Sequence, residues 1–106
     1  MSRKETPIFS GVLKYFPLAL AEIARCSLSG NEQHHKDKPL HWDKSKSADH
    51  LDALTRHLID SSVNPIDEDG VKHLTKVAWR ALAALQIQIE NELLDNANVK
   101  KGEWPQ

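Results

Sequence analysis

The sequence is poor in the residues that mark several classes of protein. Its 106 residues include one cysteine, Cys26, so no intrachain disulfide can form, and a free thiol is typical of a reducing cytoplasm. The four glycines stand apart, which excludes a glycine-rich phosphate-binding loop. No apolar run approaches the roughly 18 residues of a membrane-spanning helix, and no signal peptide is recognisable. We therefore expect a cytoplasmic protein with no membrane partner.

The chain also lacks an excess of charge of one sign. Lysine and arginine number 14 against 15 aspartates and glutamates, which gives a formal net charge of −1. Proteins that bind nucleic acids or membrane surfaces in general carry a basic excess, so the composition argues against both classes. It leaves room for a local basic pocket around one phosphorylated small molecule.

The clearest positive signal is helical periodicity, and we predict an all-α fold with one domain over residues 1–106. The first helix should become firm near Pro17, because proline suits a first helical turn, and should end at Gly30 in a left-handed cap. Residues 31–47 have no apolar period, which predicts a long functional loop. The arrangement expected is a three-helix bundle-like domain, with helices at 12–28, 48–60 and 69–95 and a frayed tail at 96–106.

The third predicted helix carries an apolar stripe along its whole length. A helix of this length is longer than its two partners can cover, and a domain this small buries only a limited core. We therefore predict that a homo-oligomer completes the fold. The stripe consists of Val71, Leu74, Ala78, Ala81, Leu82, Leu85, Ile89 and Leu93.

Acidic residues on the second predicted helix suggest a magnesium site. Asp49 and Asp52 are three residues apart and so share a helical face. Two carboxylates of this kind can hold a hard dication that also binds substrate phosphates, and Asp69 could add a third ligand. The alternative is a solvated face with a local ion pair between Asp52 and Arg56.

Basic residues suggest a phosphate site. Lys76 and Arg80 are one turn apart on the third predicted helix, and Arg56 could face them from the second. The alternative is that these cations pair with Asp49, Asp52, Asp67 and Asp69. Trp42 and Trp79 could stack on a base, although for Trp79 a position in the core is the favoured interpretation.

Histidines offer two further interpretations. His57 and His73, with His41, could bind a transition metal, but no HxxxH or CxxC pair supports this. They could instead form hydrogen bonds to a phosphate or a base. The predicted ligand-binding residues are Asn31, His35, His41, Trp42, Lys46, Arg56, His73, Lys76 and Arg80.

These residues together resemble a known family. The pattern comprises Gly30-Asn31, His35, Pro39-Leu40-His41-Trp42, Lys46-Ser47, Asp49-His50, Asp52, Arg56-His57-Leu58, Asp67-Glu68-Asp69-Gly70, His73 and Lys76 to Leu82. Over about residues 12–92 it is similar to the bacteriophage dATP/dGTP diphosphohydrolase N-terminal domain-like family. The resemblance implies an all-α phage protein of the host cytoplasm that handles purine deoxynucleoside triphosphates.

The resemblance also implies candidate chemistry. Related all-α pyrophosphohydrolases hold Mg²⁺ with paired acids on two helices, which would make Asp49, Asp52 and His57 the catalytic candidates and Asp49, Asp52 and Asp69, or Glu22, the metal ligands. The third helix has His73, Lys76 and Arg80 where that class has acids, a pattern that suits phosphate binding. Three functions stay open: hydrolysis of a purine dNTP to dNMP and pyrophosphate, sequestration of a nucleotide or nucleotide second messenger, and a helical interaction module.

Overall fold

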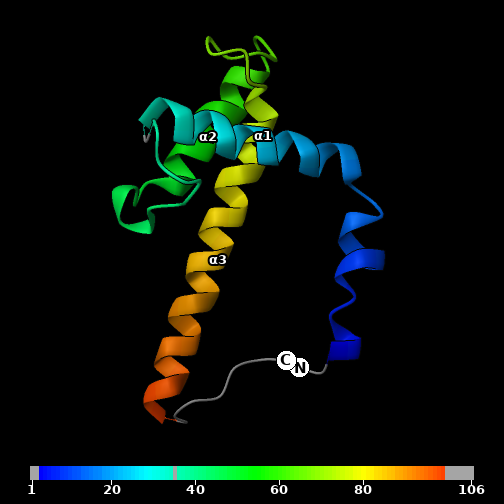
Figure 1. Ribbon diagram of the computed structural model, residues 1–106, viewed down its shortest axis with the longest axis vertical. Coiled ribbons are helices and arrows are strands. Elements are labelled where there is room, and N and C mark those ends of the chain that lie inside the picture. The colour runs from blue at the N-terminus through cyan, green and yellow to red at the C-terminus, as the bar shows by residue number, and fades with distance from the viewer. Residues whose placement is uncertain (1–2, 35, 100–106) are drawn as a thin grey trace.

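The computed structural model describes residues 3–34 and 36–99, which form an all-α domain (Figure 1). Within these ranges there is no β-strand, only an isolated bridge between Ile66 and Lys72. The predicted fold class is confirmed. Three α-helices dominate: α1 (Pro17–His34), α2 (His50–Ser61) and α3 (His73–Val99). The shorter turns are η1 (Arg3–Glu5), η2 (Phe9–Leu13) and η3 (Lys44–Lys46).

Helix α1 begins at the proline, as expected, but it does not end where the sequence suggested. It continues through Gly30 to His34, and Gly30 has no positive φ, so the predicted left-handed cap at Gly30 is wrong. The reason lies in the last turn, where Asn31 is buried and its Nδ2 donates to the carbonyl of Lys38 at 3.1 Å. The burial and hydrogen bond of Asn31 offset the cost of one helical glycine, about 1 kcal/mol.

The start of α2 also differs in detail from the expectation. The helix was expected from residue 48, but Asp49 holds the N-cap position, and the Ser47 hydroxyl donates to Asp49 Oδ1 at 2.8 Å. Arg80 donates to the same hydroxyl from α3, again at 2.8 Å. Ser47 therefore joins the loop to two helices instead of capping one.

Helix α3 begins at His73, four residues after the expected start. The intervening residues form a tight turn in which the Gly70 N–H donates to the Asp67 carbonyl at 2.9 Å and Gly70 has a φ of 84°. Because this left-handed conformation, which favours glycine, is incompatible with an α-helix, α3 cannot include Gly70. The expected tail is helical as far as Val99. His35, and Trp104 with the rest of 100–106, lie outside the described residues.

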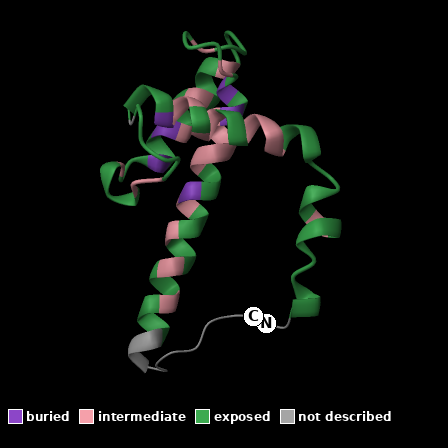
Figure 2. Ribbon diagram, in the orientation of Figure 1, coloured by how far each residue is buried: buried purple, intermediate pink, exposed green. Residues whose placement is uncertain are grey.

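The three α-helices meet at one end of the molecule. Helix α2 packs along the first half of α3, α1 crosses the same region, and the rest of α3 extends as a rod (Figure 1). Buried residues cluster at this junction (Figure 2). Among the described residues the fully buried apolar side chains are Ala53 and Ala83, whereas Asn31, His50, His73 and Thr75 are buried polar ones. A junction this polar is unusual for a core and marks the region that carries the site.

Across the described ranges no single helix is long and apolar enough to cross a membrane. Two consecutive helical segments, Arg3–Leu13 and Pro17–His34, which meet at an angle of 89°, together have the length and composition of such a helix.

Candidate functional site

The helix junction contains an open pocket of about 480 Å³. This volume falls within the range of small-molecule sites, roughly 300–1,000 Å³. The end of α1, the segment before α2, the inner face of α2 and the first turns of α3 form its walls. It brings together most of the predicted ligand-binding residues: Asn31, His41, Trp42, Lys46, Lys76 and Arg80, with His57 and Asp69 beside them.

Arg80 is the most informative cation in the pocket. Its Nη1 donates to Ser47 Oγ at 2.8 Å and to His50 Nδ1 at 3.0 Å, and its guanidinium lies 5.9 Å from the centre of the Trp79 ring. No carboxylate of the described residues forms an ion pair with it. The side chain is thus held in place by neutral partners, and its positive charge stays available to an anion.

His50 was missed by sequence reasoning, although it is part of the site. It is 6% exposed, and burial, followed by the charge of Arg80, lowers the pKa of its imidazole. Because a guanidinium can only donate, Nδ1 of His50 accepts and the ring proton lies on Nε2. That nitrogen is buried and has no hydrogen-bond partner in the described part of the chain. His50 therefore lines the pocket and holds Arg80 through Nδ1, while its Nε2–H is buried.

Two tryptophans, Trp42 and Trp79, pack against each other and against His50 in the pocket wall. The rings of Trp42 and Trp79 are 5.5 Å apart in an edge-to-face arrangement, and Trp79 Nε1 donates to Ser27 Oγ at 2.8 Å. Trp79 therefore ties α1 to α3 as a packing residue. Trp42 is half-buried, and Lys44 Nζ lies 5.2 Å from the centre of its ring.

Lys76 differs from Arg80 because acids neutralise it. Its Nζ lies 2.6 Å from Asp67 Oδ2 and 2.7 Å from Asp69 Oδ2. These hydrogen bonds lower the pKa of both carboxyl groups and outweigh the effect of burial on the lysine, so that the pKa of Lys76 is raised. The sequence left open whether Lys76 and Arg80 pair with acids or bind a phosphate. Lys76 pairs with acids, whereas Arg80 has no ion pair among the described residues.

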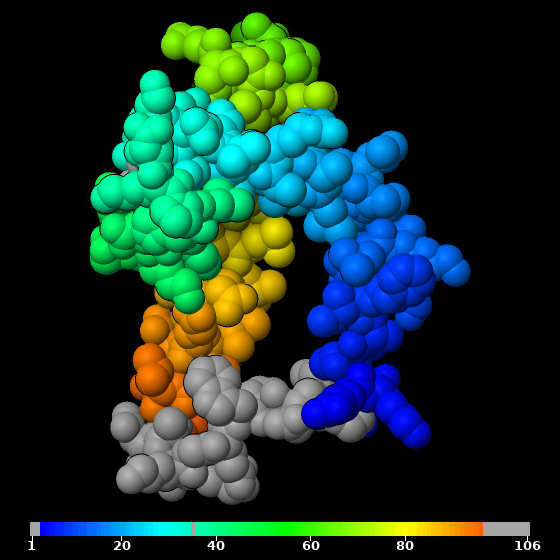
Figure 3. Space-filling model, in the orientation of Figure 1, coloured from blue at the N-terminus to red at the C-terminus, as the bar shows by residue number. Residues whose placement is uncertain are grey.

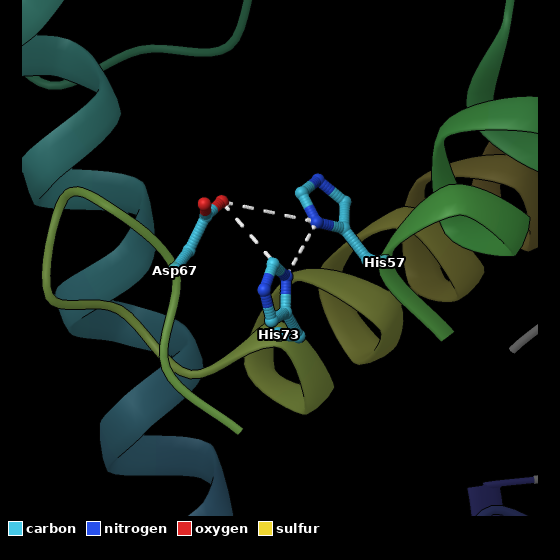
Figure 4. Close-up of side chains that lie close together, drawn as sticks. All are labelled: His57, Asp67 and His73. Carbon is cyan, nitrogen blue, oxygen red and sulfur yellow. Dashed lines mark hydrogen bonds and ion pairs between the residues drawn. The ribbon is translucent and has the colours of Figure 1, made fainter. Parts of the chain in front are cut away.

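A second cluster lies behind Lys76, where α2, the 66–72 turn and α3 meet. His57 Nδ1 lies 3.0 Å from His73 Nδ1, and both nitrogens lie 3.9 Å from Asp67 Oδ2 (Figure 4). His73 is buried, whereas His57 also lines the main pocket. The sequence offered Asp67 as an ion-pair partner and as part of the family pattern, and no local pattern links residues 57, 67 and 73.

The three predicted magnesium ligands lie in two different places. Asp49 and Asp52 line a separate hollow beside Ala84 and Ile87, whereas Asp69 lines the main pocket. Asp49 accepts from Arg56 Nη2 at 3.3 Å, an exposed pair that keeps Arg56 out of the main pocket. The structure thus does not bring the three acids together as one group.

Comparison with known proteins adds a family assignment. Neither the curated proteins nor the solved structures contain a match. A family model described as dATP/dGTP diphosphohydrolase, N-terminal, matches residues 4–97, which include every element of the site. A match over most of the chain associates the protein with nucleotide handling, and we conclude that this chain belongs to the dATP/dGTP diphosphohydrolase N-terminal family.

Proposed function

We propose that the main pocket binds the phosphate groups of a purine deoxynucleoside triphosphate. The observation that carries the proposal is Arg80, a half-buried guanidinium that Ser47 and His50 hold in place and that forms no ion pair with a carboxylate of the described residues. A planar guanidinium with free donors matches phosphate geometry. The family description supplies the class of ligand, dATP or dGTP.

The surroundings of Arg80 support an anionic ligand. Three cations, Lys46, Lys76 and Arg80, line the pocket. Because Asp67 and Asp69 neutralise Lys76, Lys46 and Arg80 are the cations that can attract an anion there. Next to the pocket, the buried Nε2–H of His50 has no acceptor among the described residues. The half-buried ring of Trp42 provides an apolar surface for a base.

Binding without cleavage fits this geometry better than magnesium-dependent hydrolysis by the predicted acids. Hydrolysis would need Asp49, Asp52 and Asp69 around one ion, but the first two line a different hollow from the third. Hydrolysis to dNMP and pyrophosphate stays a second candidate, because the family description names a diphosphohydrolase.

The test is calorimetric titration of dATP and dGTP, with EDTA present, into the wild-type protein and an Arg80→Ala variant. We expect at least tenfold weaker binding for Arg80→Ala, because the guanidinium that binds the phosphate is removed. Arg80→Lys, which keeps the charge, should cause an intermediate loss. Arg25→Ala, on the exposed side of α1, is the matched control and should bind normally. Lys46→Ala, at an exposed position, tests the same pocket should Arg80→Ala fail to fold.

Two results would contradict the binding proposal: no titration signal from either nucleotide, or equal affinity for the Arg80→Ala variant and the wild type. Cleavage is tested separately. Protein, Mg²⁺ and dGTP are incubated, the mixture is heated, and the released nucleotide is separated by chromatography. Recovery of intact dGTP supports binding alone, whereas dGMP with pyrophosphate supports the hydrolase.

A further inference from the structure

We propose that His57, Asp67 and His73 bind a transition-metal dication of the zinc class. Within the described residues they are the one group of three His, Cys, Asp or Glu side chains whose ligand atoms all lie within 4.8 Å of one another. The three come from α2, the 66–72 turn and the first residue of α3, and Figure 4 shows them converging on one point. The inference does not depend on the nucleotide proposal, and the two can fail separately.

The distances suit coordination. The three ligand atoms form a triangle with sides of 3.0, 3.9 and 3.9 Å. The point equidistant from the corners of such a triangle lies about 2.1 Å from each of them, which is the length of a zinc bond to imidazole nitrogen or carboxylate oxygen. An ion would therefore fit with little movement of the side chains.

The ring nitrogens are also disposed to bind an ion. Without an ion, one Nδ1 must donate to the other, because two Nδ1 lone pairs 3.0 Å apart would repel. With an ion, both rings carry their proton on Nε2 and both Nδ1 lone pairs face the metal. Two nitrogens and one oxygen favour Zn²⁺, Co²⁺ or Ni²⁺, whereas Mg²⁺ prefers oxygen ligands alone.

Lys76 competes with the ion for one ligand. Its Nζ lies 2.6 Å from the same Asp67 oxygen and repels a dication, but it lies 2.7 Å from Asp69 and can keep that partner. Lys76→Met should therefore bind the ion several-fold more tightly than the wild type. Lys76 thus lowers the affinity of the site for a dication, so that binding depends on the strong affinity of transition metals for the two imidazole nitrogens.

One of the three ligands, His57, also lines the main pocket. His57, Lys76 and Asp69 line the main pocket, so an ion bound at the cluster lies at the pocket wall. Three protein ligands with an open position are typical of zinc sites that bind water or a substrate oxygen.

The test is titration of Co²⁺ into the untagged protein, freed of metal and kept in millimolar Mg²⁺, with detection by visible absorption and calorimetry. We expect one Co²⁺ per chain and a d–d absorption band typical of mixed nitrogen and oxygen ligands. His57→Ala and Asp67→Asn should each weaken binding at least tenfold. Both positions are partly exposed, so these variants keep the test usable if the buried His73→Ala does not fold.

Matched controls are His34→Ala, a histidine of the pocket rim, and Asp52→Asn, an exposed acid of α2; both should bind Co²⁺ like the wild type. Circular dichroism establishes that each variant is folded. Two results would overturn the proposal: no Co²⁺ or Zn²⁺ binding by the wild type at micromolar concentration, or binding that survives in both His57→Ala and Asp67→Asn.

Discussion

At the scale of single residues, the site depends on which polar groups already have partners. Lys76 and Arg80 are the same kind of residue one turn apart, yet two acids neutralise the first and a serine and a histidine hold the second. A sequence shows the charge of a side chain but not its partner. The distinction decides which cation is available to a phosphate.

His50 makes the stability of the protein depend on pH. Its pKa is lowered by burial and by the charge of Arg80, and its Nδ1 must stay unprotonated to accept from that guanidinium. Below pH about 6.5 the unfolded chain binds a proton at this residue that the folded chain does not. The contribution of His50 to the free energy of unfolding should therefore be fully present above that pH and decrease as the pH is lowered further.

This prediction is measured by urea unfolding between pH 7.5 and 5. His50→Gln should give a flatter pH dependence than the wild type. The slope should not vanish, because burial also lowers the pKa of His57. Equal slopes for the wild type and His50→Gln would show that His50 is not the group responsible.

At the scale of the elements, two glycines should respond in opposite ways to substitution by alanine. Gly30 is helical and has open space where a Cβ would stand, so Gly30→Ala should stabilise the protein by about 0.5–1 kcal/mol. Gly70 has equally open space but a φ of 84°, so Gly70→Ala should destabilise it by about 1 kcal/mol. Denaturant midpoints measure both effects, and a destabilising Gly30→Ala would contradict the continuous α1.

These elements also show what the sequence can and cannot predict. The start of α1 at Pro17 and the approximate position of α2 follow from local signals, namely a fixed φ and an apolar period. The continuation of α1 past Gly30 depends on Asn31 reaching the carbonyl of Lys38, and this contact cannot be seen in a window of neighbouring residues. The cluster of residues 57, 67 and 73 depends on a turn that brings α2 and α3 together. Fewer than half of the residues that line the pocket were predicted as site residues, and these are polar residues in a few short segments.

At the scale of the whole molecule, the single chain leaves its predicted core uncovered. Leu74, Leu82, Leu85 and Ile89 of the α3 stripe are 61%, 50%, 52% and 42% exposed. A gap separates the N-terminal segment from the second half of α3 in the space-filling view (Figure 3). The stripe predicted from the sequence thus exists, but within one chain it does not become a core.

A second copy of the chain is the partner that we expect on this face. Two α3 helices can bury their stripes against each other, and removing this much apolar surface from water stabilises an assembly of small domains. Light scattering after size exclusion should therefore give a mass at least twice the 12.0 kDa of one chain. Leu85→Glu should lower that mass to the monomer and lower the melting temperature, because it places a charge in the apolar contact. Gln88→Glu, an exposed position on the same helix, should leave the assembly intact. A monomeric wild type at about 100 μM, a concentration at which even weak dimers form, would mean that the stripe is solvated or covered by something other than this chain.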